Sequence, residues 1–195
     1  MMPLNFNGGS NAFKPYVRYM ASTSSWSKSG DNGAEPFQFT QGVFDLHNIE
    51  TGWCLFQEGQ APAWAMDESI ERPVARPDGD GWKRGFKVDI FSTSMFGDDE
   101  PVREWATNGA GSTMSLSQLY ADFEANEEHK LGKVPVVAFE GAVATEVGRG
   151  RTTVPTLKIV KFIDRPTQMQ IGSMVDTPAA SISQNSQPQS VADEF

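Results

Sequence analysis

Residues 134–147, VPVVAFEGAVATEV, and residues 153–164, TVPTLKIVKFID, are two long runs rich in β-branched side chains. They flank a short connection, Gly148-Arg149-Gly150-Arg151. β-Branched residues favour strands, and a glycine-containing connection of this length is typical of a tight turn between antiparallel strands. The sequence therefore predicts a β-hairpin that closes the folded part of the chain.

A helix is predicted directly upstream of this hairpin. Residues 115–128, SLSQLYADFEANEE, place four large apolar side chains at helical spacing. Ser115 followed by Gln118 has the pattern of a capping box, in which each side chain bonds a free backbone N–H of the first turn. We expect the helix to begin at Ser115 and to end near Gly132.

Farther upstream, the hydrophobic pattern has a period of two. In residues 82–91, WKRGFKVDIF, apolar or long side chains alternate with a second set that is basic and contains one aromatic ring. This alternation predicts a strand with one buried face. Residues 37–46 and the apolar run 53–56, WCLF, flank a turn-like segment and predict another hairpin.

The order of these elements favours a mainly β fold. Three strands, one helix and a closing hairpin match the OB-fold, a five-stranded Greek-key barrel with one helix between strands 3 and 4. Residues 57–81, which contain three prolines, then form a long loop between the second and third strands. An immunoglobulin-like sandwich is the alternative, but it has no obvious place for a well-capped helix here.

The two ends of the chain differ from its centre. Residues 14–20, KPYVRYM, predict a short extended segment, and the polar, glycine-rich residues 22–36 predict a mobile loop. Residues 166–195 contain no Lys or Arg and few large apolar groups. We therefore expect a nucleic-acid-binding domain over residues 1–165 and a disordered linker with an acidic tip over residues 166–195.

Composition excludes several classes of protein. The 195 residues carry 16 Lys and Arg against 25 Asp and Glu, a formal charge of -9, so a uniformly basic surface is excluded while a local basic patch is not. The single cysteine, Cys54, forms no internal disulfide, and two histidines are too few for Cys/His metal clusters. With no signal-peptide pattern or membrane-spanning run, we expect a soluble protein of a reducing compartment.

The sequence offers little for catalysis. It has no nucleophile elbow, no phosphate-binding P-loop and no HExxH motif. His47 and His129 have no nucleophile or ligand partner nearby in the sequence, and the acidic clusters 78–80 and 98–100 lack the EF-hand pattern. We expect no enzyme, no catalytic residue, no cofactor and no metal site.

Nucleic-acid binding has a better, although distributed, signal. Proteins that bind single strands combine cations along a groove with flat side chains on which bases stack. Lys83, Lys87 and Phe91 share one face of their predicted strand, and Arg149 and Arg151 lie at a hairpin tip without an acid. Trp53, Trp64 and Trp105 are expected in the core. The candidate DNA-binding residues are Tyr16, Arg18, Trp26, Lys28, Lys83, Lys87, Phe91, Arg149, Arg151, Lys158 and Lys161.

The last three residues, Asp193-Glu194-Phe195, place carboxylates and one aromatic ring at the end of the predicted linker. Such a tip suits a partner pocket that has a hydrophobic slot and a basic rim, and it can compete with DNA for a basic groove. We assign these three residues to partner binding.

An OB-like core followed by a Pro/Gln/Ser linker and this acidic, Phe-terminated tip resembles the bacteriophage single-stranded-DNA-binding proteins of the T7-like type. The tip lacks the proline that precedes the terminal Phe in the bacterial proteins. The resemblance implies binding of single-stranded DNA without strong sequence preference during phage replication, recombination and repair, in the cytoplasm of the infected bacterial host. It also implies contacts with a polymerase, primase or helicase through the tail, no membrane partner, and a possible homodimer.

A β-rich phage module for protein interaction or structure, without nucleic-acid binding, is the alternative function. Salt dependence separates the two, because phosphate binding releases counterions and weakens steeply as salt rises.

Overall fold

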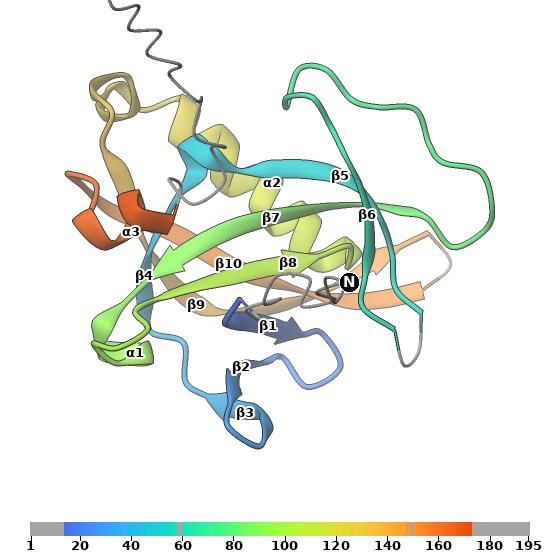
Figure 1. The fold of residues 1–195 in the computed structure, drawn as a ribbon, viewed down its shortest axis with the longest axis horizontal. Coiled ribbons are helices and arrows are strands. Elements are labelled where there is room, and N and C mark those ends of the chain that lie inside the picture. The colour runs from blue at the N-terminus through green and yellow to red at the C-terminus, as the bar shows by residue number, and fades with distance from the viewer. Residues whose placement is uncertain (1–13, 58–59, 149, 173–195) are drawn as a thin grey trace, which may run out of the picture.

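The computed structural model describes residues 14–57, 60–148 and 150–172. Its described part is mainly β, with strands, helices and short 3₁₀ helices (η) distributed along the chain (Figure 1). The strands are β1 (Tyr16–Met20), β2 (Ser25–Gly30), β3 (Gly33–Phe37), β4 (Gln41–Phe44), β5 (Glu50–Leu55), β6 (Ala63–Met66), β7 (Lys83–Phe91), β8 (Val102–Thr107), β9 (Val134–Val147) and β10 (Gly150–Ile163). The helices are η1 (Leu46–Asn48), α1 (Thr93–Phe96), α2 (Ala110–Glu124), η2 (Glu127–Leu131) and α3 (Thr167–Gly172).

The described strands form one sheet in the order β10-β9-β4-β7-β8-β1-β2-β3, with β5 pairing with both β6 and β7. Within the described ranges, β10 and β3 remain its two ends and no pairing closes the sheet. The mainly β prediction is confirmed, but the sheet is neither five-stranded nor closed. The strand β1 lies parallel to β8, at the place where closure of a barrel would require β10.

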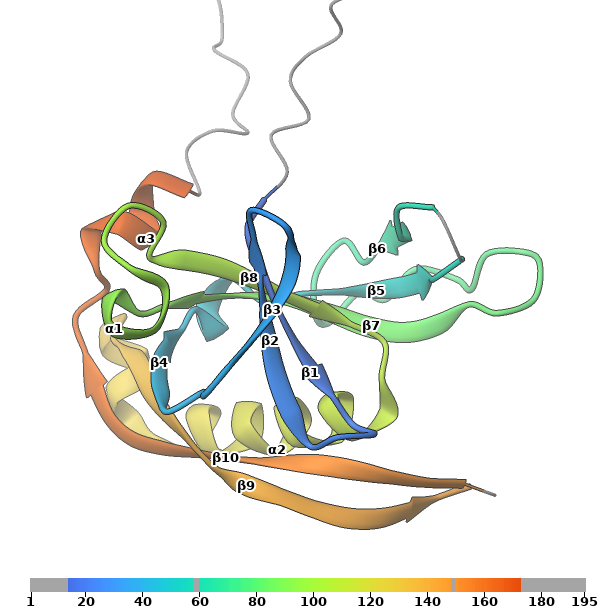
Figure 2. The ribbon, with the colours of Figure 1, turned by 90° about the horizontal axis from the view of Figure 1, so that it is seen from below.

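The closing hairpin is confirmed. β9 and β10 pair antiparallel along their length, from Val147 opposite Gly150 to Val134 opposite Ile163. β4 pairs with β9 only at residues 136–138, so the hairpin continues beyond it as an arm, residues 140–148 and 150–156 (Figure 2). The arm contacts the N-terminal segment, because the Thr153 hydroxyl lies 2.9 Å from the Tyr19 hydroxyl and donates a hydrogen bond of 2.5 Å to the Ala21 carbonyl.

The predicted hairpin over residues 37–56 is wrong. β4 and β5 do not pair with each other, because both pair antiparallel with β7, and η1 joins them. β4 and β5 therefore lie one after the other along the same edge of β7. The long loop predicted over residues 57–81 also contains a strand, β6, which pairs with β5.

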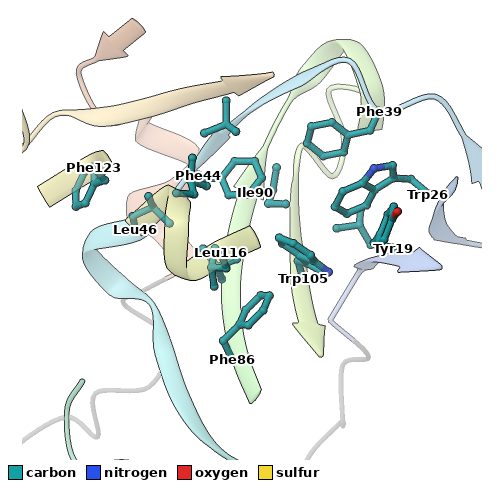
Figure 3. Packing of buried hydrophobic residues seen from close by; sticks show 14 of the residues in the cluster. Tyr19, Trp26, Phe39, Phe44, Leu46, Phe86, Ile90, Trp105, Leu116 and Phe123 are labelled. Atoms are coloured by element: carbon teal, nitrogen blue, oxygen red, sulfur yellow. The ribbon is translucent and has the colours of Figure 1, made fainter. Parts of the chain in front are cut away.

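The loop predicted over residues 22–36 is in fact the β2–β3 hairpin. Its tryptophan, Trp26, is 2% exposed and lies in the main core (Figure 3). Trp105 is fully buried beside it. The centroid of the Trp105 ring lies 5.1 Å from that of Trp26 and 4.8 Å from that of Phe86. This aromatic core holds the N-terminal hairpins onto β8, since large rings bury much apolar surface.

The helix α2 lies between β8 and β9 in sequence and packs along β10 (Figure 2). It begins at Ala110, five residues before the predicted start, and Gly109 occupies the N-cap position without a side-chain bond. Ser115 is not a cap: it is buried within the helix and donates a hydrogen bond of 2.5 Å to the Pro155 carbonyl of β10. A Cβ at Gly111 would collide with the Thr153 carbonyl, so this glycine permits the close approach of helix and strand.

A second, smaller core cluster lies where the chain leaves β10. Val43, Val134, Val136 and Met169 are buried there. Met169 belongs to α3, so the folded chain continues past the boundary predicted at Arg165. None of the helices in the described ranges is long and apolar enough to cross a membrane.

Candidate nucleic-acid interface

The alternation predicted for β7 is confirmed. Phe86, Val88 and Ile90 are buried in the core, whereas Lys83 and Lys87 belong to the opposite set of positions. We call the face that bears Lys83, Lys87, Asp89 and Phe91 the outer face. Lys83 is exposed and Lys87 half-buried, so the half of the outer face near the start of β7 presents two cations.

Trp64 of β6 lies on this same face, although the sequence assigned it to the core. Trp64 pairs with Cys54 of β5, which pairs with Lys83 of β7, and residues opposite each other in adjacent strands share a face. The Lys87 ammonium lies 5.2 Å from the centroid of the Trp64 ring. This is a cation–π arrangement.

Gly85 makes room for this ring. A Cβ at Gly85 would lie 3.1 Å from Cη2 of Trp64 and 2.5 Å from the Thr107 carbonyl. The half-buried indole therefore reaches from β6 across β5 to β7, where it meets Lys87. The signal in the sequence was the alternating segment AWAM, which is too short to separate from a loop by pattern alone.

Two predicted residues of β1 join the outer face. Asp89 pairs with Glu104 of β8, and Glu104 pairs with Tyr16 of β1, so Tyr16 and Arg18 share a face with Lys83 and Lys87. Arg18 is exposed and Tyr16 half-buried. The structure thus brings together four of the predicted residues from two distant segments.

Acidic groups occupy the middle of this face. The Lys14 ammonium lies 2.8 Å from an Asp89 oxygen and 3.4 Å from a Glu104 oxygen. Burial lowers the pKa of Lys14, but the hydrogen bond and charge of Asp89, with the charge of Glu104, outweigh it and raise the pKa overall. Lys14 offsets only one of these two carboxylates, and Glu50 of β5 lies opposite Lys87, so the cations Lys83 and Lys87 share this face with several acidic groups.

Phe91 does not present a free ring. One row across four strands contains Phe91 of β7, Val43 of β4, Val136 of β9 and Lys161 of β10. Phe91 packs against the core cluster that contains Met169. Phe91 and Lys161 border the same hollow of about 210 Å³, together with Ser92 and Ser94. Lys161 is exposed, so this end of the outer face presents the Lys161 ammonium, whereas the Phe91 ring is packed against the cluster.

Trp26 and Lys28 are not part of this surface. Trp26 is buried in the core, so its ring cannot stack on a base in this structure. Lys28 pairs with the buried Val17, on the opposite side of β1 and β2 from Arg18. Its ammonium donates a 3.0 Å hydrogen bond to the Met95 carbonyl.

The remaining predicted residues lie on or beyond the hairpin. Arg151 is exposed on the arm, opposite Glu146. Lys158 forms an exposed ion pair with Glu140, with N and O atoms 3.5 Å apart. Arg149 and the tip Asp193, Glu194 and Phe195 lie outside the described residues.

On the other face of β5 and β7, Asp67 organises a buried polar network. Its carboxylate is 1% exposed and accepts hydrogen bonds from Arg84, from the Thr51 hydroxyl at 2.6 Å and from the Val74 N–H at 3.0 Å. The hydrogen bond from Arg84 is the largest influence on the pKa of Asp67, and it outweighs burial, so the pKa lies well below its ordinary value. The network fastens residues 67–74 to β5 and β7.

We expect Asp67→Asn to lower the free energy of unfolding at pH 7 by about 1–2 kcal/mol, since Arg84 is 38% exposed and solvent screens part of the pair. Because the folded pKa is depressed, the stabilisation is complete above the unfolded pKa of about 3.9 and is lost as the pH falls below it. Urea unfolding between pH 7 and pH 2.5 measures this. The difference in the free energy of unfolding between the parent and Asp67→Asn should shrink as the pH falls. A difference that stays constant contradicts the depressed pKa of Asp67.

Within the described residues, no group of three or more His, Cys, Asp and Glu side chains is placed to hold a metal ion. Cys54 is fully buried, and burial raises the pKa of its thiol to about 11 despite the nearby charge of Lys87. The thiol is therefore protonated at neutral pH and poorly nucleophilic.

Comparisons of the chain with protein-family models, with curated proteins and with solved structures found no match.

Proposed function

We propose that the protein binds single-stranded DNA without strong sequence preference. The observation that carries the proposal is the position of Trp64 beside Lys87 and in the same cross-strand row as Lys83, on the outer face of β7. An aromatic surface beside cations is what a single strand requires, because bases stack on the ring while phosphates approach the ammonium groups. The acidic net charge does not exclude this, because a local site needs only the two lysines beside Trp64.

The strand order supports an OB-like core as the origin of this surface. β4 with β5, then β7 and β8, form a meander; α2 follows; β9 returns to pair with β4, and β10 pairs with β9. An OB-fold has this connectivity, with its helix between the third and fourth strands, and is often only partly closed. In this proposal β1 takes the position beside β8 at which a closed barrel would have its fifth strand.

The proposed OB-like core also supports an expected position for the DNA. OB-folds bind oligonucleotides on the face of their second and third strands and with the loops that join strands 1–2 and 4–5. Here the corresponding parts are the outer face of β7 and β8, the segment 56–82 that contains Trp64, and the arm that carries Arg151. The proposed DNA-binding residues are therefore Lys83, Lys87 and Trp64, with Tyr16, Arg18 and Arg151 at the periphery.

A titration of labelled oligo-dT and of a matched duplex at two salt concentrations tests the proposal. We expect oligo-dT to bind more tightly than the duplex and its affinity to fall steeply with salt, because neutralised phosphates release counterions. An absence of oligo-dT binding at low salt rejects the proposal and leaves a protein-interaction or structural module as the function.

Lys87→Glu should impair binding more than the nearby Asp89→Asn. The first variant reverses a charge beside Trp64, so the slope of log affinity against log salt should fall by roughly one phosphate contact. The second removes an acid that pairs with Lys14, so affinity should stay equal or rise. Fluorescence anisotropy of labelled oligo-dT measures both, and equal effects of the two variants argue against a phosphate at Lys87.

The biological setting and protein partners are part of the same proposal. By its resemblance to phage proteins, the chain acts in replication, recombination and repair in the host cytoplasm, and Asp193, Glu194 and Phe195 contact a polymerase, primase or helicase. These three residues carry two acidic side chains, a terminal carboxylate and one aromatic ring.

Deletion of residues 173–195 tests the tail, because it retains every described element including α3. We expect oligo-dT affinity to stay equal or to tighten at low salt, since the deleted segment has acids and no base. Binding to a replication partner should be lost. Weaker DNA binding by the truncated chain would contradict this role.

A further inference from the structure

A cavity of about 310 Å³ lies between α2 and the face of β5 and β7 that is opposite to Trp64. Its volume is at the lower end of the range for small-molecule sites, which are mostly apolar with a few convergent polar groups. The apolar side chains of its lining are Ile49, Ile70, Phe86 and Leu116. The size and the lining of the cavity therefore suit one small molecule that contains an apolar ring.

The wall that carries Ile70 is held in place. The Asp67 N–H donates a 2.9 Å hydrogen bond to the Thr51 carbonyl, and the buried Asp67 carboxylate accepts hydrogen bonds from Arg84 and from the Thr51 hydroxyl. Ile70 is nevertheless 44% exposed, so the cavity reaches the surface beside this side chain. The cavity is thus bounded by a fixed segment and is open to a ligand from solvent.

The strongest hydrogen-bond donor in the lining of the cavity is Arg84. Arg84 and Phe86 are alternate residues of β7, so their side chains share the face that borders the cavity. The Nη1 and Nη2 atoms of Arg84 each donate one hydrogen bond to Asp67, which leaves other N–H groups of the guanidinium for a ligand. The hydroxyls of Thr51 and Thr113, which also line the cavity, already donate within the protein. A ligand with an oxygen acceptor therefore meets a charged donor at Arg84.

The charges around the cavity favour a neutral ligand. A cation inside would meet Arg84, the one charged side chain among the described residues of the lining. An anion would lose its hydration for a guanidinium that Asp67 already neutralises. Exposed acids also follow two lining residues: Glu71 comes directly after Ile70, and Glu124 lies one helical turn beyond Tyr120.

We propose that this cavity binds a small neutral aromatic carbonyl compound, such as an aryl ketone or amide. The ring of the ligand occupies the space between Phe86, Leu116 and Ile70, and its carbonyl oxygen accepts a hydrogen bond from the Arg84 guanidinium. The site does not depend on DNA binding, because Lys83, Lys87 and Trp64 lie on the other face of β5 and β7.

Titrations of the full chain with three ligands of similar size test this site: neutral acetophenone, anionic benzoate and cationic 1-phenylethylamine. We expect acetophenone to bind at least about five-fold more tightly than either charged ligand, because a charge loses its hydration in a largely apolar cavity. Amide NMR shifts should centre on Phe86 and Leu116. Equal or tighter binding of a charged ligand, or shifts confined to another surface, overturns the proposal.

A variant that fills the cavity localises the binding. Ser117→Phe places a ring in the lining and should abolish acetophenone binding. Gln118→Phe, at the next position of α2 but outside the lining, should leave this binding unchanged. Acetophenone binding that persists in folded Ser117→Phe rejects the site.

A second pair of variants tests the carbonyl contact and keeps the proposal testable if Ser117→Phe fails to fold. Arg84→Lys retains a cation beside Asp67 but removes the guanidinium donors. It should weaken acetophenone binding about five-fold and leave the binding of ethylbenzene, which has no carbonyl, within about two-fold of the parent. Arg76→Lys is the matched control, because Arg76 also lies beside Trp53 but does not line the cavity, and it should change neither affinity. Unchanged acetophenone binding in Arg84→Lys, or an equal loss for both ligands, overturns the proposal.

Discussion

Replacement of Trp64 by alanine should weaken oligo-dT binding by about 5- to 150-fold, which corresponds to the loss of about 1–3 kcal/mol from one stacked base. The ring lies across β5 and β7 beside the Lys87 ammonium, 5.2 Å from its centroid. Alanine removes the stacking surface and leaves Lys87 without its aromatic neighbour. Equilibrium titrations of labelled oligo-dT at constant salt measure the change.

Another half-buried tryptophan, Trp53, provides the matched control. Trp53 lies on the opposite face of β5, beside Arg84 and Arg76, at 5.5 and 5.9 Å from ring centroid to guanidinium carbon. Trp53→Phe should leave DNA affinity unchanged, and Trp64→Phe should restore most of what Trp64→Ala loses. Melting temperatures identify any variant that acts by unfolding. If Trp53→Phe weakens binding and Trp64→Phe does not restore it, the DNA lies on the other face.

The elements predicted correctly are those defined by local periodicity. β7 alternates over nine residues and β9 and β10 are each 14 residues long, so their patterns are long enough to be read without knowledge of their partners. The same holds for α2, although both of its ends were misplaced: it begins at Ala110 instead of Ser115, and it ends at Glu124 instead of near Gly132. Ser115 has the sequence of a cap, but its hydroxyl bonds a carbonyl of β10 that lies 40 residues away.

The errors concern which strands pair. β4 and β5 are consecutive and apolar, as in a hairpin, but η1 turns the chain so that both reach β7. β8 was not predicted at all, because VREWAT contains a buried arginine at a position that the pattern expects to be apolar. Its Arg103 is accommodated by hydrogen bonds of 2.7 Å to the carbonyl and hydroxyl of Ser29. Only the folded N-terminal hairpin supplies these acceptors.

The candidate site was half predictable for the same reason. Lys83 and Lys87 follow from the alternation of β7 alone. Tyr16 and Arg18 reach the same face through the parallel pairing of β1 with β8, and Trp64 reaches it through β6, so both depend on contacts distant in sequence. Trp26 has the same polar and basic neighbours in sequence as a surface ring, yet its burial is decided by Trp105 and Phe39.

Asp45→Ala should cause the largest loss of stability, about 3–5 kcal/mol, because it breaks a largely buried ion pair and leaves the half-buried Arg165 guanidinium without its partner. The Asp45 side chain is 4% exposed and pairs with Arg165, whose side chain is 19% exposed. Asp45 also accepts a 3.1 Å hydrogen bond from the Asn48 amide. Urea unfolding of the parent and the variant at pH 7 gives the difference.

The ion pair joins the end of β4 to the chain just beyond β10, so its loss should act together with the loss of α3. Truncation after Arg165 removes Met169, which is 3% exposed, and should itself lower the free energy of unfolding by about 2–5 kcal/mol, as for other buried methionines. Truncation after Gly172 keeps Met169 and should cost little.

Lys158→Ala is the control for Asp45→Ala: it breaks an exposed ion pair and should change the free energy of unfolding by less than about 1 kcal/mol. If Asp45→Ala is as mild as Lys158→Ala, or if the two truncations are equally stable, the segment after β10 is not part of the cooperative fold, and the boundary at Arg165 suggested by composition is the better one.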